Sequence, residues 1–237
     1  MKFSLCIPMY NEAAVIEETA KTLSQYMSEN FEDYEILFSD DGSLDGSAEL
    51  VKGLSLPCVR VVGYPNNQGK GRAIREAVLA AEGDVIMFTD ADLAYGTDVI
   101  GKFARAMEDM PNTDVLVGSR NLSDDGYEEY TLIRKLASKA YIKLLSTVGG
   151  LKLSDSQCGC KAFRRDAAKR IFPYCEVNGF AFDFEVILLA TRMKMEIQEL
   201  AVKVINHRGS KVNVVSDALR MTADVRKIKR RIKHLEF

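Results

Sequence analysis

Short apolar runs alternate with longer amphipathic stretches through the first half of this chain. Brief apolar runs bounded by turn residues are typical of buried strands, and apolar residues at helical spacing are typical of helices. The expected strands cover residues 3–8, 35–39, 59–63, 84–89 and 115–118. The expected helices cover residues 12–29, 70–81 and 98–110. This rhythm predicts an α/β fold, a Rossmann-like and mostly parallel sheet with helices on both faces.

Polar residues gather where each expected strand ends. The five ends carry Pro8-Met9-Tyr10-Asn11-Glu12, Asp40-Asp41-Gly42-Ser43, Asn66-Asn67-Gln68-Gly69-Lys70-Gly71, Asp90-Ala91-Asp92 and Gly118-Ser119-Arg120. Taken one at a time, several of these segments consist of residues that are common in turns. Parallel strands place their carboxyl ends on one edge of the sheet, and open α/β sheets bind ligands at that edge. We therefore expect the five ends to form one ligand site.

The pair Asp90 and Asp92 directly follows the apolar run Val85-Ile86-Met87-Phe88. Two carboxylates this close repel each other unless a positive charge lies between them. A hard divalent cation with oxygen ligands fits, and such a cation commonly also binds substrate phosphates. The alternative is that the pair caps the helix that begins near Thr97, because Asp is a common N-cap residue. The pattern favours Mg²⁺ and Mn²⁺ equally.

Lys70 lies between two glycines at the start of the expected helix 70–81. Helix N-termini bind anions, so an anion site would lie beside the cation site. Together the two sites suggest a pyrophosphate bridged by a metal, with Asp40 or Asp41 accepting hydrogen bonds from a base or a ribose. The chain lacks the P-loop pattern, and no Gly-x-Gly-x-x-Gly follows its first strand, which disfavours P-loop enzymes and dinucleotide dehydrogenases.

Charge, hydropathy and cysteine content narrow the class of protein. The formal net charge of −2 gives no reason to expect nucleic-acid binding. No apolar run approaches the length of a membrane span, and the N-terminus lacks a signal-peptide pattern, so we expect a cytoplasmic protein. The five cysteines have neither zinc-site nor disulfide-framework spacing, which predicts reduced thiols, most of them buried.

In this order and spacing, the motifs resemble those of the family 2 glycosyltransferases. Pro-Met-Tyr-Asn-Glu, Asp-Asp-Gly-Ser-x-Asp-Gly-Ser, Asn-x-Gly-Lys-Gly and Asp-Ala-Asp carry the likeness, which extends over residues 3–211. Residues 155–163 and 180–185 resemble the dolichyl-phosphate β-glucosyltransferase branch. The resemblance implies a GT-A domain over 1–211, a nucleotide-sugar donor, a divalent cation and inversion at the anomeric carbon. The branch implies transfer of glucose from UDP-glucose to a polyprenyl phosphate.

The resemblance also implies roles for single residues. Residues expected around the nucleoside are Pro8, Tyr10, Glu12 and Asp40. Residues expected at the donor phosphates and the metal are Lys70, Asp90 and Asp92. Residues expected to hold the acceptor phosphate are Arg120, Arg134 and Ser138. The basic pair expected to close over the donor is Arg208 and Lys211. Asp41, Ala91 and Gln157 complete the expected substrate-binding set.

This sequence departs from the branch in two ways. We expect no N-terminal membrane anchor of the kind that the eukaryotic members carry, and Cys160 stands where an aromatic residue is expected.

The acceptor decides whether the enzyme needs a general base. A phosphomonoester has a second pKa of about 6 and is mostly ionised near neutral pH, so positioning and charge neutralisation suffice. A hydroxyl acceptor must lose a proton, and Asp155 is then the best candidate base, with Asp183 and Glu185 behind it. Asp183 and Glu185 are explained equally well by helix capping and by pairing within the protein. A hydroxyl-acceptor glycosyltransferase of polysaccharide or cell-envelope assembly and a non-catalytic nucleotide-sugar-binding module therefore stay as alternatives.

Two basic segments would bring the chain to a membrane-embedded acceptor. Residues 129–148 form an apolar stripe at helical spacing with flanking basic residues, as in helices that lie in a membrane interface. Residues 212–237 form a basic helix or tail, of which 226–234 contain no acid. We expect peripheral contact with the cytoplasmic membrane face. The alternatives are a core helix or a homo-oligomer face for the first segment and a solvated tail for the second.

Overall fold

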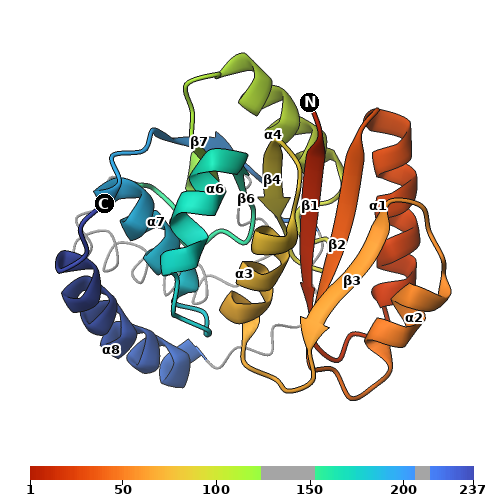
Figure 1. Cartoon of the computed structure of the whole chain (residues 1–237), viewed down its shortest axis with the longest axis horizontal. Helices are drawn as coiled ribbons and strands as arrows, with labels where there is room; N and C mark the ends of the chain where they lie inside the picture. Colours follow the sequence, from red (N-terminus) through yellow and green to blue (C-terminus); the bar gives the residue numbers. More distant parts are fainter. Residues whose placement is uncertain (124–152, 206–213) are drawn as a thin grey trace.

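The computed structural model describes residues 1–123, 153–205 and 214–237. One seven-stranded sheet forms its centre, in the order β3-β2-β1-β4-β6-β5-β7. The strands are β1 (Phe3–Met9), β2 (Tyr34–Asp41), β3 (Val59–Tyr64), β4 (Val85–Phe88), β5 (Val115–Ser119), β6 (Lys161–Arg164) and β7 (Ile197–Ala201). Only β6 is antiparallel, and it pairs with both β4 and β5. The other six strands therefore point the same way, with β1, β3 and β4 directed toward the lower edge of the sheet in Figure 1.

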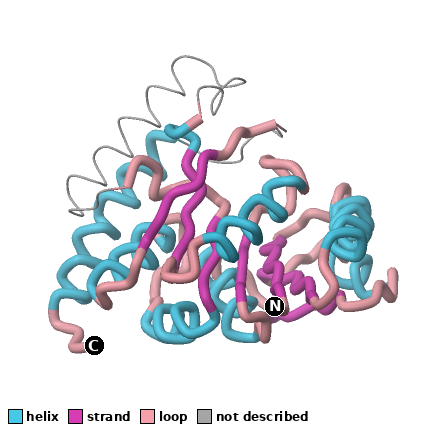
Figure 2. The backbone as a smooth tube through the Cα atoms, turned by 90° about the horizontal axis from the view of Figure 1, so that it is seen from above, coloured by secondary structure: helices cyan, strands magenta, loops and turns pink. Residues whose placement is uncertain are grey.

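Helices cover both faces of the sheet, as Figure 2 shows. One face packs against α1 (Ile16–Asn30), α2 (Ser47–Gly53) and α4 (Asp98–Asp109). The other face packs against α3 (Lys70–Ala80), α6 (Arg165–Ile171), α7 (Phe182–Arg192) and α8 (Val214–Lys233), of which α3 and α6 lie in front of the sheet in Figure 1. Two short 3-10 helices, η1 (Arg120–Leu122) and η2 (Phe172–Tyr174), follow β5 and α6. This is the α/β architecture expected from the sequence.

The core explains why the middle strands are so apolar. All four residues of β4 are fully buried, because helices cover the strand on both sides. On one side the ring of Phe88 lies 6.0 Å from that of Phe163 and 5.8 Å from that of Phe182, measured between centroids. Each such phenylalanine contributes roughly 1.5–3 kcal/mol through its burial. The short strand β4 is thereby fixed, and so is the position of the acidic residues that follow it.

The strands expected from the sequence are confirmed, with their ends shifted by at most two residues. The first helix begins at Ile16 rather than at residue 12, because residues 12–15 form a turn whose carbonyl at Glu12 accepts from Val15 and Ile16. Five helices and strands were not predicted from the sequence: α2, β6, α6, α7 and β7. Of these, α2 is short, β6 carries a buried lysine, Lys161, and β7 is a partly exposed edge strand with a polar sequence.

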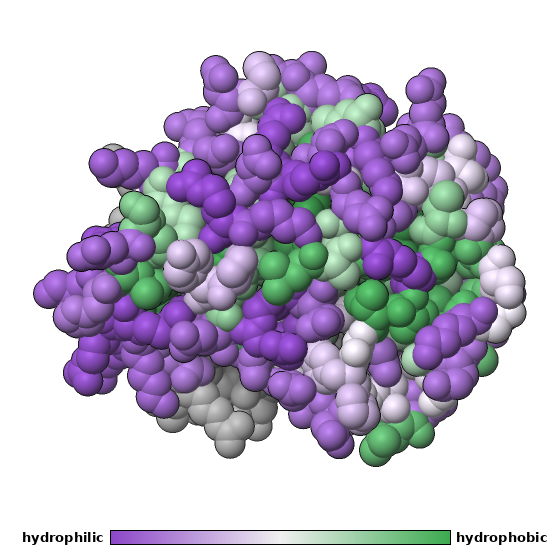
Figure 3. Space-filling model, viewed as in Figure 1, coloured by the Kyte–Doolittle hydropathy of each residue, from purple (hydrophilic) through white to green (hydrophobic). Residues whose placement is uncertain are grey.

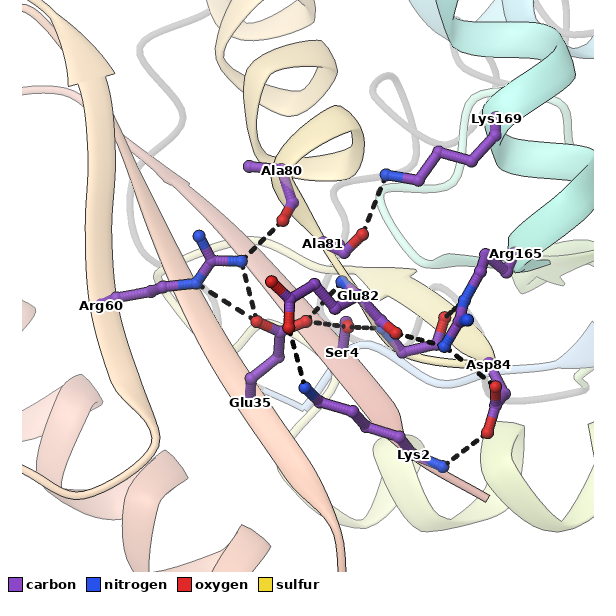
Figure 4. A network of polar contacts seen from close by, with 11 residues as sticks. Lys2, Ser4, Glu35, Arg60, Ala80, Ala81, Glu82, Asp84, Arg165 and Lys169 are labelled. Carbon is purple, nitrogen blue, oxygen red and sulfur yellow. Dashed lines mark hydrogen bonds and ion pairs between the residues drawn. The ribbon is translucent and has the colours of Figure 1, made fainter.

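The amino-terminal edge of the sheet is closed by a polar network (Figure 4). Glu35 accepts from Ser4 Oγ at 2.6 Å, from the backbone N–H of Glu82 at 2.6 Å and from Arg60 Nη2 at 2.9 Å. Arg165 donates to the carbonyls of Gly83 and Glu82 and to the carboxylate of Asp84. Each residue labelled there makes at least one hydrogen bond or ion pair within the protein. The contacts at this edge hold strands and helices together, and the strand ends with the predicted site residues lie at the opposite edge.

Within the described ranges, the structure contains no helix that is both long and apolar enough to cross a membrane. The expected helix 129–148 lies outside these ranges.

Candidate active site

The loops after β1 and β2 are tied together at the carboxyl edge of the sheet. The backbone N–H of Asn11 donates to Ser43 Oγ at 2.9 Å, and Asn11 Oδ1 accepts from the N–H of Leu44 at 2.9 Å. The N–H of Glu12 donates to Ser47 Oγ at 2.9 Å. Asn11 adopts φ 52°, a region that Asn tolerates better than most residues. Two of the five predicted strand ends are therefore in direct contact.

Asp40 and Asp41 have different surroundings. Asp41 is only 3% exposed, and its carboxylate accepts from Tyr64 Oη, Asn67 Nδ2 and the backbone N–H groups of Gln68 and Gly69, at 2.7–3.1 Å. Asp41 thus organises the loop that leads into α3. Asp40 is partly exposed and accepts from the N–H of Ser43 at 3.1 Å. Of the two carboxylates, Asp40 is the one that can still reach a ligand.

Lys70 begins α3 and forms an ion pair with Asp90, the second residue after β4. Both side chains keep about a quarter of their surface accessible, 25% for Lys70 and 28% for Asp90. Burial alone would lower the pKa of Lys70, but the charges of Asp90, Asp183 and Asp92 raise it above its usual value. The lysine is therefore a permanent cation at a helix N-terminus, where an anionic ligand is doubly favoured.

Asp92 lies in a turn of its own. Its Oδ1 accepts from the N–H of Ala94 at 3.0 Å, and the carbonyl of Ala91 accepts from Thr19 Oγ1 at 3.0 Å. The next helix, α4, begins only at Asp98 with Thr97 at its N-cap position. The helix-cap explanation of the Asp90 and Asp92 pair is therefore wrong, since neither residue lies at the start of α4.

The carboxylates of Asp90 and Asp92 are hard oxygen donors of the kind that Mg²⁺ and Mn²⁺ bind. Among the described residues, no group of three or more His, Cys, Asp or Glu is arranged to hold a metal. A cation held here would therefore take its remaining ligands from water or from a bound phosphate, as Mg²⁺ commonly does. The residues present fit a metal that binds together with a diphosphate.

Arg120 and Asp155 form a buried pair beyond the end of β5. Arg120 Nε donates to Asp155 Oδ2 at 2.7 Å, and Nη2 donates to Oδ1 at 3.0 Å. Asp155 is fully buried, and Arg120 is 9% exposed. Such fork-to-fork pairs fix the orientation of the guanidinium as well as its charge. Asp155 is thus placed to orient Arg120.

Asp183 and Glu185, the two further candidates for a general base, both form ion pairs within the protein. Asp183 pairs with the fully buried Lys161, and Glu185 pairs with Arg231 of α8. Burial raises the pKa of Asp183, and the nearby Lys161 and Lys70 only partly offset that rise. The internal-pairing explanation of these two residues is the one that the structure supports.

Two residues near Asp90, Lys161 and Tyr95, were not among the site residues predicted from the sequence. Lys161 Nζ donates to the carbonyl of Cys158 at 2.6 Å and lies 5.6 Å from the centroid of the Phe88 ring. Tyr95 is buried, and its hydroxyl accepts from the N–H of Gly159 at 3.3 Å. The segment around Gly159 touches Asp90 so closely that a Cβ at Gly159 would lie 2.4 Å from Asp90 Oδ2. The one signal in the sequence is Lys161 itself, a lysine directly before the apolar pair Ala162-Phe163.

The remaining predicted residues divide into two groups. Pro8 and Glu12 are partly exposed and Tyr10 is 40% exposed at the end of β1, beside the loop after β2. Gln157 Nε2 is buried without a hydrogen-bond partner among the described residues. The others lie outside the described ranges: Arg134, Ser138, Arg208 and Lys211.

Of the five cysteines, Cys6, Cys158, Cys160 and Cys175 are buried and Cys58 is exposed, and all are free thiols. The expectation that most of the cysteines are buried is confirmed.

Comparison with known proteins identifies relatives of this architecture. The family described as "Glycosyl transferase family 2" matches residues 4–172. A dolichyl-phosphate beta-glucosyltransferase of Trichomonas vaginalis is 31% identical over 92% of this chain and 68% of its own length. A dolichyl-phosphate beta-glucosyltransferase of Saccharomyces cerevisiae is 29% identical over 94% of this chain and 72% of its own length. The resemblance first suggested by the motifs thus extends along nearly the whole chain.

Solved structures share the fold. Glucosyl-3-phosphoglycerate synthase of Mycobacterium tuberculosis, in complex with Mn²⁺, uridine diphosphate and glucosyl-3-phosphoglycerate, superposes with a TM-score of 0.71. The match covers 100% of this chain and 81% of the synthase, at 18% identity. At that identity the likeness establishes the GT-A fold and nothing finer.

Proposed function

This chain belongs to glycosyl transferase family 2, and on that premise we propose that it transfers a glucosyl residue to a polyprenyl phosphate with inversion. The observation that carries the proposal is the ion pair of Lys70 and Asp90 at the carboxyl edge of the sheet, with Asp92 two residues further on. A cationic group and an acidic pair at one sheet edge suit a diphosphate that binds together with a metal. The relatives named dolichyl-phosphate beta-glucosyltransferase support the sugar and the acceptor.

The donor is proposed to be UDP-glucose. In the synthase of the same fold, uridine diphosphate and a glucosyl product are bound together with Mn²⁺. Here Lys70 would neutralise the donor phosphates, and Asp40, Tyr10 and Glu12 would surround the nucleoside. Charge neutralisation by groups fixed before the reaction lowers the barrier without any reorganisation of the site.

We propose that a divalent cation is required, with Asp92 and Asp90 as its protein ligands. Bound there, it would act as a Lewis acid for the departing diphosphate. Asp90 is paired with Lys70 in the structure, so cation and lysine would share this carboxylate.

Asp155 favours a phosphate acceptor over a hydroxyl acceptor. It is fully buried and holds the guanidinium of Arg120 with both oxygens, so it is poorly placed to receive a substrate proton. A polyprenyl phosphate arrives already ionised and needs only to be positioned. Arg120, fixed by Asp155, is the residue that we propose for this task in the described part of the chain.

We also propose that α8 brings the protein to the cytoplasmic face of a membrane. In the part of α8 whose side chains are described, residues 224–233, Val225, Ile228 and Ile232 pack into the core and the exposed side chains are basic. The exposed basic residues are Arg226, Lys227, Lys229, Arg230 and Lys233. Figure 3 shows a strongly hydrophilic surface over this helix, at the lower left. Each basic residue near an anionic leaflet contributes about 1 kcal/mol of binding.

Transfer assays with purified protein test the function. UDP-glucose and other labelled sugar nucleotides are offered with Mn²⁺ and a short polyprenyl phosphate, and in parallel with the corresponding polyprenol. We expect a glucosylated lipid phosphate only from UDP-glucose, and no product from the alcohol. Transfer to the alcohol, or no transfer from any sugar nucleotide with any lipid phosphate, would contradict the proposal.

A further inference from the structure

The loop of residues 175–179 lies against the N-terminus of α3. The N–H of Gly71 donates to the carbonyl of Asn178 at 2.7 Å. A Cβ at Gly71 would lie 2.6 Å from the carbonyl oxygen of Val177, and one at Gly69 would lie 2.5 Å from that of Asn178. The two glycines that flank Lys70 are therefore required for a close backbone approach. Arg75 of α3 adds contacts, donating to the carbonyl of Cys175 and to Asn178 Oδ1.

The other side of this loop is held by one buried carboxylate. Glu185 of α7 is fully buried, and its Oε2 accepts from the N–H of Glu176 at 3.0 Å and from that of Val177 at 2.9 Å. Charge-assisted bonds from a carboxylate to backbone N–H groups are among the stronger hydrogen bonds in proteins. The shape of the loop therefore depends on the carboxyl group of Glu185 being in place.

Glu185 is in turn held by the C-terminal helix. Arg231 of α8 pairs with Glu185 Oε1, and its Nη1 donates to the carbonyl of Tyr174 at 2.9 Å and contacts Glu176 Oε1 at 3.0 Å. A cavity of about 380 Å³, lined in part by Asn178, Glu185 and Arg231, lies between the loop and α8. These polar contacts join α8 to the loop, beside the apolar contacts of the shared core.

We infer that Arg231 and Glu185 are positioning residues, which hold the N-terminus of α3, and with it Lys70, at the donor site through the loop 175–179. The inference rests on the proposed function in one respect, that Lys70 meets the donor phosphates. Its consequence is that a helix at the end of the chain, which touches neither Lys70 nor Asp90 in the contacts described, sets the affinity for the sugar nucleotide.

The test compares Arg231→Ala with Arg165→Ala. Arg165 is a matched control, because it also joins a helix to backbone carbonyls and a carboxylate, but at the opposite edge of the sheet (Figure 4). Calorimetry with UDP and Mn²⁺ should show a dissociation constant about fivefold to tenfold higher for Arg231→Ala and unchanged for Arg165→Ala. Arg231→Lys keeps the charge at Glu185 and should recover part of the affinity.

Hydrogen exchange supplies a second readout that needs no ligand. The amide of Gly71, bonded to Asn178, should exchange faster in Arg231→Ala than in the wild type and remain protected in Arg165→Ala. Equal protection of Gly71 in all three proteins, or equal UDP affinity of the two variants, would overturn the inference. Failure of the wild type to bind UDP would overturn the donor assignment instead, while the exchange data would still decide whether α8 positions α3.

Discussion

Arg120 and Asp155 meet as two parallel forks, Nε to Oδ2 at 2.7 Å and Nη2 to Oδ1 at 3.0 Å, in a region closed to solvent. The backbone N–H of Arg120 donates to the same carboxylate at 3.2 Å. The N–H of Gln157 donates to it as well, at 3.3 Å, so four N–H groups engage this carboxylate. Of the two roles considered for Asp155, orienting Arg120 therefore fits these contacts better than acting as a general base.

Asp155→Asn separates these two roles. If Asp155 orients Arg120, the variant should raise KM for the lipid phosphate about tenfold, with an unchanged Kd for UDP and an unchanged shape of the pH–rate profile. Loss of a general base would instead lower kcat by roughly 10²–10⁴-fold and remove the acidic limb of that profile. Steady-state kinetics of the wild type and the variant, measured from about pH 5.5 to about pH 8.5, distinguish the two roles. This range includes the pH at which a phosphomonoester ionises.

The same pair should matter for stability. Breaking a buried ion pair by removing one partner costs about 3–5 kcal/mol, because the remaining charge stays buried. Urea denaturation of Asp155→Ala should show a loss in that range. The control is Asp84→Ala, whose exposed pair with Arg165 should contribute at most about 1 kcal/mol.

Lys70 and Asp92 should affect donor binding in different ways. Lys70→Ala removes a charge-assisted contact and should weaken UDP binding by roughly 10–100-fold, with or without Mn²⁺. Asp92→Ala should leave metal-free binding of UDP unchanged and abolish the gain that Mn²⁺ gives the wild type. Titration calorimetry with EDTA and with Mn²⁺ measures both effects, and Lys52→Ala on the exposed side of α2 serves as the control. An undiminished response of Asp92→Ala to Mn²⁺ would exclude that residue as a metal ligand.

The sequence was sufficient for those parts of the fold that depend on local pattern. Strands β1 to β5 are apolar runs followed by turn residues, so their number and direction could be predicted, and with them the shared edge of Asp40, Lys70 and Asp90. The antiparallel strand β6 could not, because it has only four residues and its first, Lys161, is a charged residue in the core. Its burial depends on Asp183, twenty-two residues further along the chain, and such pairing has no local signal.

The sequence also could not show which single carboxylates face a ligand. Asp40 and Asp41 are adjacent and indistinguishable in the sequence, and only the register of β2 turns Asp41 inward to Tyr64 and Gly69. Because successive residues of a strand point to opposite faces, a shift of one residue would have exchanged their environments.

Glu35 should make the stability of the fold depend on pH. Burial alone would raise the pKa of this carboxyl, but bonds from Ser4, the Glu82 N–H and Arg60 hold it below its ordinary value of 4.5. A depressed pKa in the folded state means that the ionised form stabilises the fold above about pH 4.5, and that this contribution is lost as pH falls through the lower, folded value. The melting temperature of Glu35→Gln should therefore lie well below that of the wild type at pH 7, and the difference should shrink toward pH 3. A constant difference over that range would contradict the ionised role.

The basic side of α8 should bind anionic vesicles. Arg226→Glu combined with Arg230→Glu reverses two exposed charges without touching the buried Ile228 or the pairing of Arg231. At about 1 kcal/mol per charge, these reversals should lower the partition onto phosphatidylglycerol vesicles by at least about tenfold, with little binding of either protein to phosphatidylcholine.

The control is the double variant Lys52→Glu with Lys102→Glu. It makes the same change of net charge on the helices of the opposite face and should bind as the wild type does. Transfer to a detergent-solubilised acceptor should be equal in all three proteins, because the affected step is arrival at the surface rather than chemistry. Equal vesicle binding by both double variants would show that net charge, and not α8, attracts the protein to the lipid.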